Sequence, residues 1–167
     1  MEKAELFNKI SDRLKEKFHG SLEKAELLYD FPVFTIQKDH IFEVLQFLKE
    51  DPDLNFHFLT TLTGIQTPDE KHLGVIYQLH NMHSNTRIRI KTFFPITHPD
   101  IPSATSLWPA ANWLERETYD FFGIRFTGHP NLKRILNVDE MDIFPLRKEY
   151  PVEDQSREDK SDKMFGR

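Results

Sequence analysis

Cysteine is absent from this chain of 167 residues, and glycine is scarce, with six copies. Without cysteine there is no disulfide, no thiolate nucleophile and no cysteine ligand for an iron–sulfur cluster or a c-type haem. The glycines lie too far apart for a GxGxxG or P-loop motif, so neither common nucleotide-binding loop is present. The sequence therefore gives no sign of a cofactor bound by this chain.

Long apolar runs and an excess of positive charge are also missing. No stretch approaches the roughly 18 apolar residues that span a bilayer, and the charged first 18 residues lack the apolar centre of a secretory signal. The net charge is −5 at pH 7, whereas a general nucleic-acid binder needs a basic surface. We expect no nucleic-acid partner and no direct membrane insertion, so any work at a membrane would go through a partner.

Hydrophobic residues make up 38% of the chain and include 15 phenylalanines, which is enough for one folded domain. Apolar spacing predicts helices over 2–18, over 40–50 with Asp39 as N-cap, and from Pro109 to about Phe122. Strand-like segments are expected at 25–29, 33–36, 56–63, 73–80 and 87–94. This order predicts an α+β fold, with a mostly antiparallel sheet of four to five strands packed with helices.

The C-terminal part is expected to differ from the rest. Residues 124–151 have apolar anchors without a sustained period, and residues 152–167 carry nine charges in sixteen positions. We therefore expect a globular domain over 1–128 and an extended, partner-binding tail over 129–167. Residues 137–167 are predicted to become ordered only in a complex.

The strand predicted at 87–94 alternates regularly. One face would carry Ile88, Ile90, Thr92 and Phe94, and the other Arg87, Arg89, Lys91 and Phe93. The basic face is interpreted first as a solvated sheet surface, and a docking surface is the alternative.

The most unusual segment is ERETYDFFGIRFTGHPNLKRIL at 115–136, which combines charges, aromatics, two glycines and a His-Pro step. A catalytic pair of Glu115 and Glu117 is disfavoured, because on a helix they point about 200° apart. A metal site at His129 is also disfavoured, since no second histidine lies in the segment. The composition favours an interface element, because aromatics and arginines are enriched in interfaces.

Helical spacing places Ala110, Leu114, Glu117 and Phe121 on one stripe. Glu117 would then interrupt an apolar face and need a partner such as Arg134, Arg147 or a cation of another subunit. Arg116 and Asp120, four residues apart, are expected to pair on the surface.

These residues resemble the signature of the complex I 30 kDa subunit family, which includes the C subunit of the bacterial NADH:quinone oxidoreductase. The matching positions are Glu115, Arg116, Glu117, Asp120, Phe121, Phe122, His129, Lys133, Ile135 and Leu136. The segment FPLRKEYP at 144–151 also resembles the family's Pro-Leu-Arg-Lys-x-Tyr-Pro ending, and the resemblance covers residues 1–151.

The resemblance implies a structural subunit of the peripheral arm of a proton-pumping quinone reductase. It implies that this chain binds no redox centre and docks on the large quinone-site subunit, beside neighbouring iron–sulfur subunits. NADH, FMN, iron–sulfur clusters and quinone would belong to partner subunits. The expected location is the cytoplasmic face of the bacterial inner membrane, peripherally.

The residues expected to form or support this interface come from both blocks. They are Glu115, Arg116, Glu117, Tyr119, Asp120, Phe121, Phe122, Gly123, Gly128, His129, Pro130, Lys133, Arg134, Ile135, Leu136, Pro145, Leu146, Arg147 and Tyr150. Two alternatives stay open: the equivalent subunit of a membrane-bound hydrogenase or another quinone- or ferredoxin-linked dehydrogenase, and a free-standing small hydrolase using Glu115 or Glu117.

Overall fold

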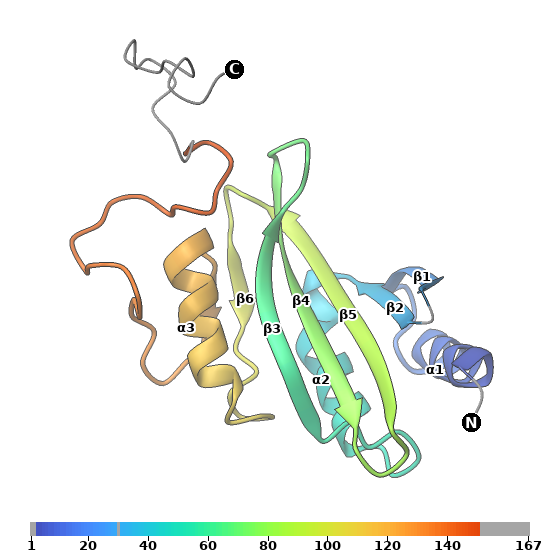
Figure 1. Cartoon of the computed structure of the whole chain (residues 1–167). Coiled ribbons are helices and arrows are strands. Elements are labelled where there is room, and N and C mark those ends of the chain that lie inside the picture. The colour runs from blue at the N-terminus through green and yellow to red at the C-terminus, as the bar shows by residue number, and fades with distance from the viewer. Residues whose placement is uncertain (1–2, 30, 151–167) are drawn as a thin grey trace, which may run out of the picture.

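The computed structural model describes residues 3–29 and 31–150, and this part of the chain forms an α+β domain (Figure 1). Its elements, in chain order, are α1 (Lys3–Lys17), β1 (Leu22–Leu28), β2 (Phe31–Ile36), the 3-10 turn η1 (Lys38–His40), α2 (Ile41–Glu50), β3 (Phe58–Gln66), β4 (His72–Asn81), β5 (Thr86–Pro95), β6 (Asp100–Pro102), α3 (Ala111–Phe122) and β7 (Arg125–Thr127). The predicted fold class and the order of the three helices are confirmed.

The main sheet has five strands in the order β1-β2-β5-β4-β3. Its neighbours are antiparallel except β2 and β5, which run parallel. The sheet is therefore mixed rather than antiparallel throughout. The parallel pair arises because the chain leaves β2, passes through α2 and the β3–β4 pair, and returns beside β2 as β5, a crossover of the kind that parallel neighbours need.

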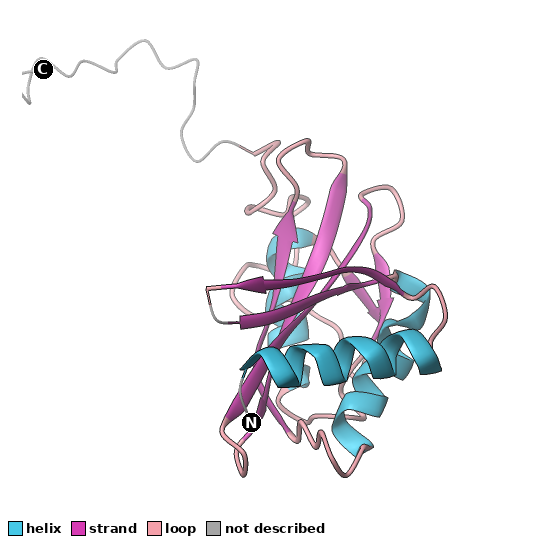
Figure 2. Ribbon diagram, turned by 90° about the vertical axis from the view of Figure 1, so that its right-hand side faces the viewer, coloured by secondary structure: helices cyan, strands magenta, loops and turns pink. Residues whose placement is uncertain are grey.

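One face of this sheet carries the core. The register aligns Phe34, Ile90, Tyr77 and Leu62 in a row across four strands, and all four side chains are buried. They pack in one hydrophobic cluster with the apolar stripes of α1 and α2. Figure 2 shows α1 lying alongside the β1–β2 pair. The alternation in sequence thus places apolar side chains on a helix-covered face.

The first two helices match their predicted stripes. Leu6, Ile10 and Leu14 are buried on α1, and the apolar face of α2, formed by Ile41, Val44, Leu45 and Leu48, is buried as well. The predicted cap of α2 is wrong, because Asp39 lies inside the turn η1 and His40 occupies the N-cap position. A 3-10 turn ahead of the helix shifts its first residue without changing its apolar spacing.

Two short strands were not predicted. β6 and β7 pair in parallel as a separate two-stranded sheet, and β6 lies in the proline-rich connection that precedes α3. Three-residue strands have too little sequence pattern to be recognised. Pro109 precedes the N-cap residue Ala110 instead of occupying the first turn of the helix.

α3 packs closely on β3, and Gly64 makes that approach possible. A Cβ atom at Gly64 would lie 2.6 Å from the ring of Phe122 and 3.0 Å from Thr118. No helix in residues 3–29 or 31–150 is long and apolar enough to cross a membrane.

Candidate functional site

The segment singled out in the sequence folds as α3, the short strand β7, and a return segment without helix or strand. We call residues 131–150 the strap. It runs back along α3 and is coloured orange to red in Figure 1. The charged residues of α3 meet the strap, so the candidate site is the joint between them.

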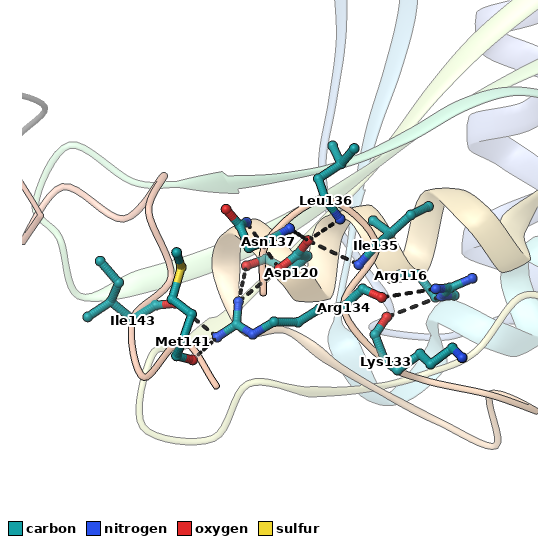
Figure 3. A network of polar contacts seen from close by, with 9 residues as sticks. All are labelled: Arg116, Asp120, Lys133, Arg134, Ile135, Leu136, Asn137, Met141 and Ile143. Atoms are coloured by element: carbon teal, nitrogen blue, oxygen red, sulfur yellow. Dashed lines mark hydrogen bonds and ion pairs between the residues drawn. The ribbon is translucent and has the colours of Figure 1, made fainter. Parts of the chain in front are cut away.

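Asp120 is the centre of this joint (Figure 3). Its Oδ2 accepts hydrogen bonds from the backbone N–H groups of Ile135, Leu136 and Asn137 at 3.1, 2.8 and 2.9 Å. Its Oδ1 accepts from Arg134 Nη1 at 2.8 Å and from the Asn137 amide at 3.1 Å. The carboxylate is fully buried, and five donors compensate for its lost hydration.

The pKa of Asp120 shows how strong this compensation is. Burial by itself opposes ionisation, but the N–H of Asn137, the Arg134 guanidinium and the N–H groups of Leu136 and Ile135 outweigh it. Together they hold the pKa of Asp120 well below its ordinary value of 3.8. Asp120 is therefore ionised at neutral pH, and its carboxylate fixes the start of the strap.

Two arginines satisfy the carbonyl groups of the strap. Arg134 donates to the backbone oxygens of Met141 and Ile143 at 2.5 and 3.0 Å. Its side chain therefore links Asp120 on α3 to the middle of the strap. Arg116 donates to the carbonyls of Lys133 and Arg134 at 3.1 and 2.9 Å. Without secondary structure in the strap, side chains supply the hydrogen bonds that its backbone needs.

At the C-terminal end of α3, an aromatic ring of the strap packs against the helix. The guanidinium groups of Arg134 and Arg147 lie over the Phe144 ring, 5.1 and 4.7 Å from its centroid, and Tyr119 makes an edge-type contact with the same ring. Gly123 takes the left-handed C-cap conformation, with φ at +71°. A Cβ there would lie 2.6 Å from the Phe144 ring, so both conformation and space require glycine.

Three further hydrogen bonds connect the strap to the domain. The N–H of Leu146 donates to the Phe121 carbonyl at 3.2 Å, and Arg147 Nε donates to the Phe122 carbonyl at 2.7 Å. The N–H of Lys148 donates to the Gln66 side chain on β3 at 2.7 Å. Pro145 and Tyr150 lie in the turns of this last part, half-buried. The strap thus packs against α3 and against the edge of the main sheet.

Glu115 is buried on the other side of α3. Its carboxylate accepts hydrogen bonds from Ser103 Oγ at 2.7 Å and from the Ala104 N–H at 2.6 Å. Burial raises the pKa of Glu115 to about 7, although both bonds lower it. No cation faces this carboxylate among the described residues, so its ionised form is poorly compensated.

The structure corrects three predictions about α3. Glu117 is exposed and bonds to no other described residue, whereas Glu115 and Asp120 are the buried carboxylates. Arg134 pairs with Asp120 instead of Glu117. Arg116 and Asp120 do not pair on the surface, because both are buried and bind separate parts of the strap. The predicted divergence of Glu115 and Glu117 agrees with their different environments.

His129 has a structural hydrogen-bonding role in the turn after Gly128. Its Nε2 lies 3.0 Å from the Asn112 carbonyl oxygen, and its Nδ1 accepts from the N–H of Asn131. The next residue, Pro130, is exposed. No group of three or more potential metal ligands occurs within residues 3–29 and 31–150, and His129 uses both ring nitrogens on the backbone.

The outward side of the strap carries large apolar side chains among charged ones. Leu136, Val138 and Leu146 are 69, 63 and 55% exposed, and Trp113 on α3 is 61% exposed. Large exposed apolar side chains grouped on one segment are typical of a contact surface. The strap therefore has an inner side that binds the domain, largely through polar contacts, and an outer side that exposes several large apolar side chains.

Several residues of the joint were not predicted from sequence. Ser103, Ala104, Asn137 and Gln66 contact the site through long-range bonds, for which no local pattern exists. Phe144 could be recognised in the sequence as an apolar anchor, but its contacts with Arg134 and Arg147 could not be predicted.

The sequence profile of the family "Respiratory-chain NADH dehydrogenase, 30 Kd subunit" matches residues 34–156. The NADH-quinone oxidoreductase C subunit of Citrifermentans bemidjiense is 40% identical over 154 residues, which cover 90% of this chain and 93% of that protein. The protein of the same name from Streptomyces coelicolor is 37% identical over 84% of this chain, which spans 61% of its length.

Two solved structures share the fold. A chain of the membrane-bound sulfane sulfur reductase, an archaeal respiratory membrane complex, has a TM-score of 0.73 at 25% identity and covers 87% of this chain and 85% of its own. A trypsin-resistant fragment of Nqo5 has a TM-score of 0.64 at 24% identity and covers 79% of this chain and all of the fragment. The second likeness concerns the fold alone.

Proposed function

The chain belongs to the family of 30 kDa subunits of respiratory-chain NADH dehydrogenases, and on that premise we propose that it is a structural subunit of NADH:quinone oxidoreductase. In this role it sits in the peripheral arm of complex I and docks on the large quinone-site subunit, next to the iron–sulfur subunits. It has no active site of its own. NADH, FMN, iron–sulfur clusters and quinone are held by partners, and the subunit lies at the cytoplasmic face of the bacterial inner membrane.

The two-sided strap is the observation that carries this proposal. Its inner side is fixed by Asp120, Arg116 and Arg134, so its outer side is presented in one conformation before a partner binds. Pre-ordering a surface reduces the entropy lost on association. The exposed leucines Leu136 and Leu146 are then apolar anchors for a pocket on the partner.

The division into domain and tail is part of the same proposal. Residues 1–128 form the folded body and 129–167 the partner-binding tail, of which the strap is the first part. Residues 151–167 lie outside the described residues. Residues 137–150 are linked to α3 and β3 by hydrogen bonds, and the ordering of residues 137–167 only in a complex stays a prediction.

The test replaces the outer anchors and leaves the inner ones. A Leu136→Ser, Leu146→Ser variant of the full chain, expressed in place of the wild type, should reduce the assembled enzyme by at least about tenfold, the effect of losing ~1.4 kcal/mol. The matched control is Leu27→Ser, Met82→Ser, which removes two exposed apolar side chains far from the strap. Equal assembly of the two variants would refute docking through the strap.

A related assembly is the second candidate. The likeness to a chain of the sulfane sulfur reductase complex supports the equivalent subunit of a cousin complex, such as a membrane-bound hydrogenase or another quinone- or ferredoxin-linked dehydrogenase. The electron-input subunits that co-purify with the tagged native chain discriminate the two. An NADH-oxidising flavoprotein subunit supports complex I, and its replacement by a hydrogenase or ferredoxin-linked subunit supports the alternative.

A further inference from the structure

The second face of the main sheet has no helix of the described chain packed on it. The register places Arg89 of β5 opposite Gln78 of β4 and beside Val33 of β2, and places Lys91 opposite Ile76 and beside Thr35. These rows alternate with the buried row that contacts the helices, so their side chains lie on the other face. In Figure 1, α2 passes behind β4 and β5, and no described element crosses in front of them.

This face carries a concentrated positive charge. Arg87, Arg89 and Lys91 occupy alternate positions on the central strand, roughly 7 Å apart along it. None of them forms an ion pair with another residue of the described chain. Glu26, the carboxylate that the register brings nearest, is bound to Lys24 at 2.7 Å. In a chain of net charge −5, the basic column is a local feature of one surface.

Polar atoms on the same face lack partners. Arg89 Nε and Gln78 Oε1 are both buried without a hydrogen bond in the described structure, although the two residues face each other across β4 and β5. The Arg89 guanidinium lies over the Phe31 ring, 5.6 Å from its centroid, which holds it in place. A partner segment that brings a carboxylate to the Arg89 guanidinium and an N–H donor to Gln78 Oε1 would satisfy both groups.

We propose that this face is a second docking surface, which binds an acidic segment of a neighbouring subunit of the same assembly; the identity of the assembly rests on the proposed function. The occupant supplies carboxylates to Arg87, Arg89 and Lys91, and apolar contacts to Phe31 and its neighbours. A protein segment fits better than a nucleic acid, because the net charge of the chain repels an extended polyanion while permitting a local acidic contact.

The experiment reverses two cations that are not packed on an aromatic ring. Arg87→Glu, Lys91→Glu is introduced into the full chain in its native host, and the control Lys15→Glu, Lys71→Glu makes the same change in net charge at exposed positions elsewhere. The test variant should lower the yield of assembled complex by about tenfold or more, because like charges across an interface are strongly unfavourable. The control should assemble as the wild type does, and circular dichroism of both purified chains should be unchanged.

Cross-linking identifies what occupies the face. A photo-reactive amino acid at position 87 of the assembled complex should cross-link to a segment rich in Asp and Glu on another subunit. Equal assembly of the test and control variants, or a cross-link to RNA or to no other chain, would overturn the proposal. If the unmodified chain fails to co-purify with any respiratory subunit, the proposed function fails instead.

Discussion

Glu115 and Asp120 lie on the same helix, five residues apart, and both carboxylates are fully buried. Asp120 has an arginine, an amide and three backbone N–H groups, and its pKa is lowered. Glu115 has one hydroxyl and one N–H, and burial raises its pKa to about 7. Burial therefore does not set the behaviour of a carboxylate; the number and charge of its donors do. The difference also separates two tasks, because Asp120 anchors the strap while Glu115 holds the loop at 103–104.

Breaking the Asp120 anchor should have the largest effect on stability. Asp120→Asn leaves the Arg134 guanidinium, which is 7% exposed, without its anion, and turns an amide donor toward existing donors. Loss of one member of a buried pair costs about 3–5 kcal/mol. Urea unfolding of the full chain measures this, with Glu117→Gln on the exposed side of α3 as control. A change in unfolding free energy no larger than that of the control would contradict the anchor role.

Amide exchange localises the same effect. In Asp120→Asn, the N–H groups of 135–137 should exchange faster than in the wild type, because they lose an ionic acceptor. Unchanged protection of these three groups would mean that the strap is held by its other contacts.

Glu115 should give a smaller effect with a defined pH dependence. The folded protein binds the Glu115 proton more tightly than the unfolded chain, with pKa values of about 7 and 4.5. The contribution of Glu115 to the free energy of unfolding is therefore most favourable below pH 4.5. As the pH rises to about 7, this contribution falls by roughly 3 kcal/mol. Asp120 acts in the opposite direction, since its contribution is lost as the pH falls below 3.8.

Replacing Glu115 with glutamine removes this titration while keeping an acceptor for the Ala104 N–H. The variant should show a flatter stability profile between pH 4.5 and 7 and exceed the wild type in stability at pH 8. Chemical unfolding at several pH values measures the slope, and Glu117→Gln should keep the wild-type slope. A Glu115→Gln profile parallel to that of the wild type would show that Glu115 does not titrate in this range.

Glu117 should give the smallest effect. It is exposed and bonds to no other described residue, so Glu117→Ala should change the free energy of unfolding by less than about 0.5 kcal/mol. Any loss of assembled complex in this variant would then come from a lost contact with a partner. A destabilisation of the isolated chain by more than about 1 kcal/mol would show that the side chain is packed, by the same scale.

The sequence pattern correctly predicted those helices and strands whose apolar residues all lie on one face. The stripes of α1 and α2 and the alternation of β5 identified their buried sides, because each meets one covering surface. The stripe predicted for α3 is wrong, since Leu114 is only half-buried while Glu115, Arg116 and Asp120 are buried. The apolar-stripe argument assumes one packing surface, and α3 is covered by β3, by the 103–104 loop and by the strap.

The sequence located the candidate site, but it did not predict how the residues of the site are arranged. The charges and glycines of 115–136 marked the right segment, and the family resemblance is confirmed. The partners Ser103, Asn137 and Gln66 come from elsewhere in the chain, and hydrogen bonds between distant segments have no period to detect.

The sequence by itself determined the family, the fold class and the exclusion of cysteine-based sites, because these follow from composition, periodicity and an unusual motif. Only the tertiary structure decided which carboxylates are buried, which arginine pairs with which acid, and which side chains of the strap face the domain. The physical reason is that periodicity specifies which residues share a face, whereas burial and ionisation depend on what other segments bring to that face.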